Sequence, residues 1–406
     1  MDKAQITILQ EQIMERMDLS KQLSGEEIRE MIDKQLMAEG KRRYLELAVR
    51  EKIRKDIFHS IRQLGILQEL IENPEITEIM VNGTEGIFIE RFGKLEQTDF
   101  SFESADKLKQ VIWQITAGCN RVVNEASPIV DARLPDGARV NVVLDPIALN
   151  GPILTIRRFP KEPITMEKLV EMGSVLPECR DYLMEKVMEG CNVLVSGGTG
   201  SGKTTFLNVL SRYIPASERV ITIEDSAELQ LKGILNLVRM ETRNANVEGC
   251  REITIRDLIR AALRMRPDRI IVGECRGAEA LDMLQAMNTG HDGSLSTGHA
   301  NSCEDMLHRL ETMVLMGMEL PLTAIRGQIA SGVDILVHVG RMRDGSRKLL
   351  NIMEVGAYTD GRIELSPLWE FQEKGEKGGK VIGEWKSREK LKNTRKLEWA
   401  GIGKSS

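Results

Sequence analysis

Residues 192–210 read NVLVSGGTGSGKTTFLNVL. The middle of this stretch fits the pattern G-x-x-x-x-G-K-S/T in full, from Gly197 to Lys203 and the threonine that follows it. A short apolar run precedes the glycines, and apolar residues at helical spacing follow the lysine. The stretch therefore predicts a buried strand, a phosphate-binding loop and a helix, in that order.

The predicted loop is typical of a site for nucleotide phosphates, and we expect ATP with Mg²⁺. Glycines let successive backbone N–H groups curl around a β-phosphate, and the following helix turns its positive end toward the same anion. Lys203 is expected to meet the β- and γ-phosphates and to be exposed when no ligand is bound, while the Thr204 hydroxyl is expected to bind Mg²⁺. The expected phosphate-binding residues are Gly197, Gly198, Thr199, Gly200, Ser201, Gly202, Lys203, Thr204 and Thr205.

Two further apolar runs end in carboxylates. The run RIIVGE ends at Glu274, and the run VITIED contains Glu224. An acid at the carboxyl edge of a parallel sheet, beside a phosphate loop, is placed to hold Mg²⁺ or to orient an attacking water. Glu274 is therefore the expected catalytic base and, in part through water, a metal ligand. Glu224 is the second catalytic candidate, because neighbouring strands could bring it close enough to share the metal and the water.

A structural explanation of the second run stays open beside the catalytic one. Asp225 or Ser226 could cap the N-terminus of a helix, with Glu228 closing a capping box three residues later. This reading would give the acids a local role in ending a strand and starting a helix. Both explanations can hold together.

A histidine-containing segment, TGHDGSLSTGHAN, occupies residues 289–301. Glycines and serines surround His291 and His299, so the segment can approach a γ-phosphate closely. His299 is expected to donate a hydrogen bond to that phosphate and thereby to report its hydrolysis. Metal binding by the two histidines is disfavoured, because no third ligand is evident.

Sequence patterns divide the chain into four segments of an α/β protein. Residues 1–70 are polar with apolar positions at helical spacing, which predicts a helical N-terminal extension. Residues 71–160 mix short strand-like runs, turns and a helix, and predict a mixed α/β domain. Residues 161–371 alternate apolar strands with helices, which predicts a parallel sheet covered on both faces. Residues 372–406 hold ten Lys and Arg against five Glu and predict a basic, mobile tail.

The composition narrows the class of protein. Of 406 residues, 41% are apolar and 29% are charged, which is typical of a globular protein. The net charge of −5 argues against a general nucleic-acid binder. The six cysteines form no C-x-x-C pair, so reduced thiols are expected. No run approaches the roughly 18 apolar residues of a membrane span, so we expect a cytoplasmic protein whose membrane role comes through a partner.

Four motifs in this order resemble those of the type II/IV secretion-system ATPase family (the GspE/PulE superfamily), which includes secretion ATPases and pilus motors. The Walker A motif is similar to GGTGSGKTT at 197–205, and the aspartate box to TIEDSAEL at 222–229. The Walker B motif is similar to LRMRPDRIIVGECRG at 263–277, and the histidine box to TGHDGSLSTGHANS at 289–302. The resemblance covers about residues 60–360, and four motifs in order are far more specific than the phosphate loop alone.

The resemblance implies a RecA-like P-loop NTPase domain, a preceding α/β domain that closes over bound ATP, and a ring of six subunits. It also implies docking to an integral membrane platform protein. Arginines of the preceding domain reach the nucleotide in this family, and Arg133 and Arg139 stand in the matching segment DARLPDGARVN at 131–141. The alternative is that both arginines belong to the surface of a hairpin.

Within the family, the sequence is similar to the CpaF-type branch, which serves tight-adherence (Flp) pili. The helical extension and the segment at 131–141 fit that branch, whereas the tetracysteine zinc element of the general-secretion members is missing. The expected function is a hexameric ATPase motor that powers pilus assembly or protein secretion. We expect it to be cytoplasmic and peripheral at the inner face of the cell membrane through its partners, without direct contact with nucleic acid.

Two other functions remain open. A RecA-like DNA-translocating ATPase shares the ring and the phosphate loop, but it needs basic surfaces with aromatic side chains, and this chain is acidic and 4% aromatic. A structural subunit that binds ATP without turnover would be expected to lack Glu274, Lys203 or the arginines, and all are present. Phosphate release with and without single-stranded DNA separates these functions.

Overall fold

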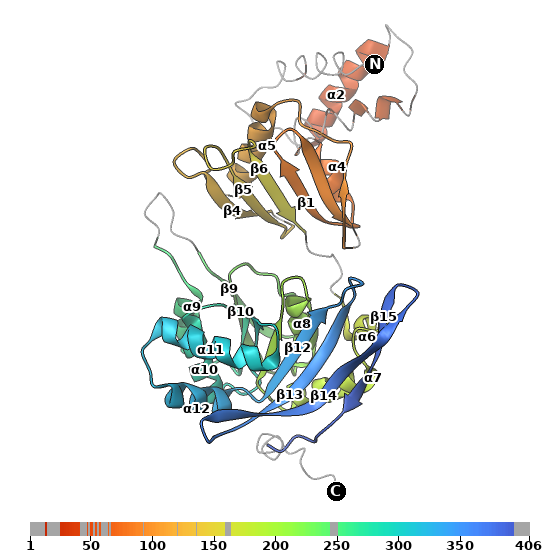
Figure 1. Ribbon diagram of the computed structural model, residues 1–406. Coiled ribbons are helices and arrows are strands. Elements are labelled where there is room, and N and C mark those ends of the chain that lie inside the picture. The colour runs from red at the N-terminus through yellow and green to blue at the C-terminus, as the bar shows by residue number, and fades with distance from the viewer. Residues whose placement is uncertain are drawn as a thin grey trace. The chain divides into compact units, whose positions relative to one another are not determined.

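The computed structural model describes residues 25–40, 66–91, 93–119, 121–134, 136–158, 164–243 and 251–393, together with Leu64 and isolated positions between 13 and 57. The chain divides into two compact units, Met1–Lys161 and Glu162–Ser406 (Figure 1). Helix α2 (Gly25–Gly40) falls where the sequence predicts a helical extension. Most of that extension, and residues 394–406, lie outside the described residues.

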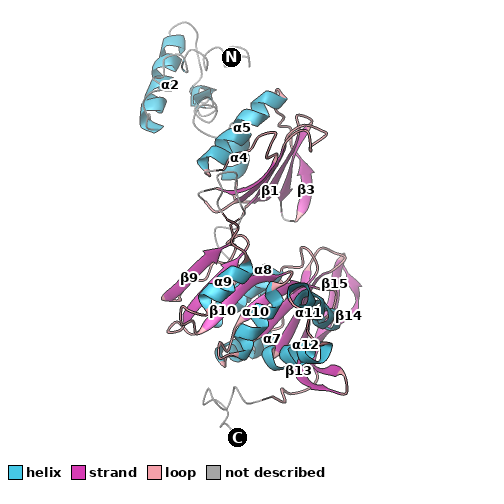
Figure 2. Cartoon of the chain, turned by 90° about the vertical axis from the view of Figure 1, so that its left-hand side faces the viewer, coloured by secondary structure: helices cyan, strands magenta, loops and turns pink. Residues whose placement is uncertain are grey.

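The first unit contains, within its described residues, a six-stranded antiparallel sheet in the order β3-β2-β1-β6-β5-β4. Its strands are β1 (Ile76–Asn82), β2 (Gly86–Arg91), β3 (Lys94–Gln97), β4 (Ile129–Arg133), β5 (Arg139–Val143) and β6 (Ile153–Arg157). Alternate side chains are buried, such as Val140 and Val142 in β5. Helices α4 (Leu67–Glu72) and α5 (Ala105–Gly118) cover the buried face (Figure 2).

The second unit contains, among its described residues, a nine-stranded sheet in the order β15-β14-β13-β12-β7-β11-β10-β8-β9. The strands from β12 to β9 are parallel, and β13 to β15 extend the sheet as an antiparallel meander. The parallel strands are β7 (Val193–Gly197), β8 (Arg219–Glu224), β9 (Asn236–Glu241), β10 (Arg269–Cys275), β11 (Leu295–His299) and β12 (Ile335–Arg341). The meander is β13 (Arg347–Thr359), β14 (Arg362–Lys377) and β15 (Lys380–Ser387).

Helices cover both faces of the second sheet, because its central strands are apolar on both sides. One apolar cluster joins the sheet to α9 (Ile255–Ala262), α10 (Glu279–Asn288), α11 (Cys303–Gly317) and α12 (Leu322–Gly332). A second cluster joins it to α6 (Met166–Glu171), α7 (Pro177–Met188) and α8 (Lys203–Leu210). This arrangement leaves the carboxyl edge of the parallel strands for the loops that carry the motifs.

The helices that border this edge begin in two different ways. Thr254 and Asp257 form a capping box at the start of α9, and the Ser302 side chain accepts the N–H of Asp305 at the start of α11. Helix α8 follows Gly202, which is in the left-handed region and offers no side-chain acceptor. The first N–H groups of α8 therefore lack a side-chain cap and remain available to an anion.

Residues 372–387, which the sequence places in a mobile tail, form the end of β14 and the whole of β15. The pair Gly378-Gly379 has φ values of +60° and +72°, which suit a tight turn between antiparallel strands. The Trp385 indole N–H donates to the carbonyl of Leu349 on β13 at 2.7 Å. The tail prediction is wrong over these residues, because a Lys- and Gly-rich composition conceals strand alternation.

Candidate functional site

The phosphate loop (residues 197–204) joins β7 to α8, and its glycines shape it. Gly200 and Gly202 have φ values of +71° and +94°, in the left-handed region that favours glycine. A Cβ at Gly197 would lie 2.3 Å from the carbonyl oxygen of Val339 on the neighbouring strand β12. Only glycine fits there, because the backbone of β12 passes directly against the first residue of the loop.

The carbonyl oxygen of Gly198 holds the loop together from inside. It accepts the Ser201 hydroxyl at 2.8 Å, the Ser201 N–H at 3.3 Å and the Lys203 ammonium at 3.0 Å. This network draws the two ends of the loop toward each other. Among the expected phosphate-binding residues, Gly198, Thr199 and Gly200 are exposed, Gly202, Thr204 and Thr205 are half-buried, and Gly197, Ser201 and Lys203 are buried.

Lys203 is only 7% exposed, so the prediction that it is exposed without a ligand is wrong. Its Nζ lies between the Gly198 carbonyl and His299, whose Nδ1 is 3.2 Å away. Burial lowers the pKa of Lys203, and the carboxylate of Glu274 opposes that effect. The Lys203 ammonium is therefore a partly desolvated cation beside the phosphate loop. Because little water screens its charge, it would attract a phosphate strongly.

His299 connects Lys203 with Glu274 across three neighbouring strands. The order β7, β11, β10 places the ends of these strands side by side, and each strand contributes one of the three residues or leads into it. His299 Nε2 is 2.8 Å from Glu274 Oε1, while Nδ1 faces Lys203. Burial is the main cause that lowers the pKa of His299. A neutral ring then accepts from the Lys203 ammonium at Nδ1, while its Nε2 stays in close contact with the Glu274 carboxylate.

Arg276 occupies the second oxygen of the Glu274 carboxylate. Its Nη2 is 2.5 Å from Glu274 Oε2, and its Nη1 is 3.9 Å from Asp225. The hydrogen bond with Glu274 raises the pKa of Arg276 further above its usual range. Sequence reasoning missed this residue. The available signal was its position two residues after Glu274, at the end of the predicted strand RIIVGE.

Glu224 ends β8, the strand beside β10, and lies against its backbone. A Cβ at Gly273 would be 2.9 Å from Glu224 Cγ. The Glu224 carboxylate is buried and accepts the N–H groups of Glu228 and Leu229 at 2.7 and 2.9 Å. Burial raises the pKa of Glu224 to about 7, against the effect of these two hydrogen bonds. The side chain thus organises the chain turn after β8.

The helix expected at this turn does not form. Residues 225–228 are irregular, so the interpretation of Asp225 or Ser226 as a helix cap is wrong. The physical reason is that the Glu224 carboxylate already satisfies the N–H groups that a capping side chain would have taken. The catalytic candidacy of Glu224 stays a prediction.

Glu224→Gln is expected to change how stability depends on pH. The pKa of Glu224 is about 7 in the folded protein against 4.5 for an ordinary glutamate, so the stability supported by its protonated form is fully present below 4.5 and is lost as pH rises through 7. The shift corresponds to roughly 3 kcal/mol. Glutamine stays neutral and keeps the acceptor, so the variant should lose this decline.

The measurement is the free energy of unfolding in urea, for both proteins, at about pH 5 and about pH 8. The wild type should lose more stability than the variant between these two values. Equal losses would contradict a titrating, buried Glu224.

The two histidines of the segment at 289–301 lie toward opposite ends of β11. His299 is its last residue and faces the phosphate loop. His291 precedes the strand, and its Nδ1 lies 3.1 Å from the carbonyl oxygen of Ala286 at the end of α10. Only His299 joins the site. Across the described ranges, no group of three or more His, Cys, Asp or Glu side chains could hold a metal ion.

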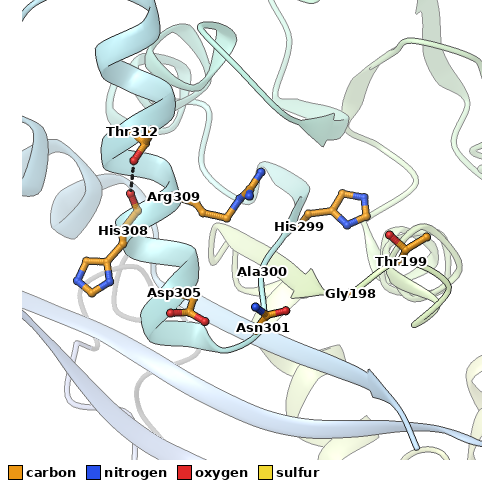
Figure 3. A pocket seen from close by; sticks show the side chains of 9 residues that line it. All are labelled: Gly198, Thr199, His299, Ala300, Asn301, Asp305, His308, Arg309 and Thr312. Atoms are coloured by element: carbon orange, nitrogen blue, oxygen red, sulfur yellow. Dashed lines mark hydrogen bonds between the residues drawn. The ribbon is translucent and has the colours of Figure 1, made fainter.

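A cavity of about 470 Å³ opens beside the phosphate loop. Gly198 and Thr199 line it from the loop, His299 and Asn301 from the end of β11, and Arg309 from one face of α11 (Figure 3). The Arg309 side chain extends from α11 toward His299 in this view. After burial, Lys203 and Arg276, the charge of Arg309 is among the causes that lower the pKa of His299. Sequence reasoning gave no signal for Arg309.

Arg133 and Arg139 belong to the first unit, where they are Cα partners at the end of the β4–β5 hairpin. The Arg133 Nε donates to the carbonyl of Gly137 at 3.2 Å. Both arginines are half-buried. Their approach to a nucleotide stays a prediction.

None of the helices in the described part of the chain combines the length and the apolar character needed to cross a bilayer.

The chain matches the family model described as "Type II/IV secretion system protein" over residues 61–352. A curated relative, the type IV secretion system protein PtlH of Bordetella pertussis, is 33% identical over 322 residues. That match covers 73% of this chain and 94% of PtlH.

Two solved structures share the fold. The pilus retraction motor PilT with bound ADP has a TM-score of 0.54 at 23% identity. The match covers 73% of this chain and 83% of the PilT chain. The ATPase DotB of Legionella pneumophila has a TM-score of 0.51 at 23% identity, over 73% and 80%. The predicted fold class is confirmed: a RecA-like P-loop domain in a mixed α/β protein. The chain belongs to the type II/IV secretion system protein family.

Proposed function

We propose that this protein is a hexameric ATPase motor that hydrolyses ATP to drive pilus assembly or protein secretion through an integral membrane platform protein. The observation that carries the proposal is the contact series Lys203–His299–Glu274 beside the phosphate loop. A cation, a neutral imidazole and a carboxylate supply what phosphate transfer to water requires. They bind the γ-phosphate, respond to its presence and act as the base for the attacking water.

Each of the three residues changes its partner when the nucleotide binds. The Lys203 ammonium leaves the Gly198 carbonyl for the β- and γ-phosphates, because a charged acceptor is stronger than a neutral one. His299 then loses its donor at Nδ1, and its ring turns from Glu274 toward the γ-phosphate. Glu274 is thereby freed at Oε1 to orient the water and accept its proton.

The residues present fit a nucleotide that carries Mg²⁺. The Thr204 hydroxyl stands in the first turn of α8, next to N–H groups without a side-chain cap. Arg276 contacts Oε2 of Glu274, and the freed Oε1 faces the attacking water, so this carboxylate would act on the metal through water. A Mg²⁺ held mainly by phosphate oxygens and Thr204 needs no cluster of carboxylates. The bound ion neutralises charge on the phosphates.

The direct test is steady-state phosphate release by the purified full-length protein with Mg²⁺ and ATP. Turnover that is independent of single-stranded DNA supports the motor. Turnover that appears only with DNA would favour a DNA-translocating ATPase, and tight ATP binding with no release would favour a structural subunit. Measuring the same samples with phospholipid vesicles shows whether a membrane surface raises the rate.

Arg139→Ala is expected to lower the turnover number at least about tenfold while ATP affinity stays within about twofold, because an arginine finger acts mainly on the transition state. We propose that Arg139, with Arg133, reaches the nucleotide of a neighbouring subunit. Mixed rings of Arg139→Ala and Lys203→Ala subunits then contain some interfaces with both groups intact. Such rings should recover activity that each variant lacks alone.

Sedimentation of the mixed sample as a single hexameric species is the control for this experiment. Wild-type turnover in both Arg133→Ala and Arg139→Ala would contradict an arginine finger. The two residues would then be surface residues of the β4–β5 hairpin only.

The finer assignment is to the CpaF-type branch that serves Flp pili. Its support is the sequence segment at 131–141 and the helix α2 in the N-terminal extension. We place the protein in the cytoplasm, held at the inner face of the cell membrane by its platform partner. Recovery from the membrane fraction, with release by a high-salt wash, tests this location. A protein that resists the wash would contradict peripheral binding.

A further inference from the structure

The phosphate loop is also contacted by a residue outside the four motifs. Strands β12 and β13 form an antiparallel hairpin whose outermost paired residues are Arg341 and Arg347. The Arg347 Nε donates to the carbonyl oxygen of Gly200 at 2.9 Å. A Cβ at Gly202 would lie 3.3 Å from Arg347 Cδ. The side chain of Arg347 therefore lies along the outside of the loop, against both of its left-handed glycines.

The bond to Gly200 has a direct consequence for anion binding. A phosphate loop binds an anion when its N–H groups point inward and its carbonyl groups point outward. Because the peptide unit is planar, a donor that fixes the carbonyl of Gly200 also fixes the direction of the N–H that follows it. Gly200 has no side chain that could hold this peptide in place. The N–H of this peptide belongs to Ser201 and donates to the Gly198 carbonyl at 3.3 Å, so the bond from Arg347 restrains the same peptide from its carbonyl end.

We propose that Arg347 is a positioning residue of the phosphate loop and that, through the Gly200 carbonyl, it raises the affinity for nucleotide phosphates. This inference rests on the proposed nucleotide site. Through Arg347, the β12–β13 hairpin would thus help to fix the conformation of the phosphate loop. The backbone of β12 adds a second contact, because the Val339 carbonyl lies against Gly197.

Arg341 provides a matched comparison on the same hairpin. It carries the same charge as Arg347 and is its Cα partner, and its Nη1 lies 3.9 Å from the position of a Cβ at Gly200. In the ranges that the structure describes, the Arg341 side chain forms no hydrogen bond or ion pair, and Arg347 forms only the bond to Gly200. Apart from the aliphatic stem of Arg347 beside Gly202, the two arginines therefore differ by one hydrogen bond to the loop.

The test compares ADP binding by the full-length wild type, Arg347→Met, Arg347→Lys and Arg341→Met. Methionine keeps an aliphatic stem beside Gly202 and removes the donor. We expect Arg347→Met to bind ADP about tenfold more weakly, and Arg347→Lys, which keeps a charged donor, to stay within about threefold of the wild type. Arg341→Met should stay within about twofold.

A second readout separates positioning from a general loss of structure. Because Arg347 acts on the loop and contacts no reacting group, KM for ATP should rise in Arg347→Met while the turnover number at saturating ATP stays within about twofold. If Arg347→Met fails to fold in a thermal melt without nucleotide, Arg347→Gln is measured against the same expectations.

The outcomes are distinct. A wild type that binds no ADP overturns the proposed function and this inference together. Wild-type affinity in Arg347→Met overturns the inference alone. An equal loss in Arg341→Met and Arg347→Met also overturns it, because the effect would then come from positive charge near the loop and not from the bond to Gly200.

Discussion

ATP turnover is expected to fall by about 10³-fold or more when Lys203 is replaced by alanine. The ammonium is the cation that meets the β- and γ-phosphates, and it is already held at the mouth of the loop between Gly198 and His299. Alanine leaves a buried gap and no charge to receive the anion. The measurement is steady-state phosphate release together with ATP affinity, and both should decline.

The fold should survive this substitution. The substitution removes the hydrogen bonds of Lys203 to the Gly198 carbonyl and to His299, but it also removes a partly desolvated charge, so the change in unfolding free energy should be within about 1 kcal/mol. Lys168→Ala on α6 is the control, because Lys168 is an exposed lysine that pairs only with Glu171 in the described structure. Normal turnover in a folded Lys203→Ala protein would remove the phosphate-site assignment.

Glu274→Gln is expected to slow hydrolysis by roughly 10²- to 10³-fold while ATP remains bound. Glutamine keeps the size of the side chain but cannot accept the proton of the attacking water. It also weakens the contacts with His299 and Arg276, both of which face a carboxylate in the wild type. Single-turnover hydrolysis measures the chemical step, and ATP affinity is measured on the same sample.

Glu319→Gln serves as the control, since Glu319 is an exposed acid between α11 and α12. Loss of ATP binding in Glu274→Gln would show that this carboxylate holds the metal or the local structure. Normal turnover would instead transfer the role of the base to Glu224.

The sequence predicted much of the site because its parts are local. A strand, a glycine-rich loop and a helix follow one another in residues 192–210, so the loop could be located from its motif alone. Glu274 ends a short apolar run and His299 ends a short strand-like run rich in Ser and Gly, and the ends of parallel strands share one edge of a sheet. Their common edge could be predicted; their 2.8 Å contact required the strand order.

Contacts between distant parts of the chain could not be predicted. Arg347 meets Gly200 across 147 residues, and no motif marks an arginine at the start of an antiparallel strand. The exposure of Lys203 was predicted wrongly, because its burial depends on His299 from another strand. The turn after Glu224 has the sequence pattern of a capping box. The N–H groups of Glu228 and Leu229 donate instead to the Glu224 carboxylate.

Strand β15 also determines how this sheet meets other molecules. Paired in place, it presents an outer edge with charged side chains such as Lys380, Glu384 and Lys386, which discourages a second chain from adding to the sheet. A polypeptide shortened at residue 371 would instead end within β14, and Trp369 and Phe371 would lose their partners on β15. That shortened protein would expose the unpaired N–H and C=O groups of β14 beside two aromatic side chains. Two such edges could pair with each other, so we expect the shortened protein to self-associate.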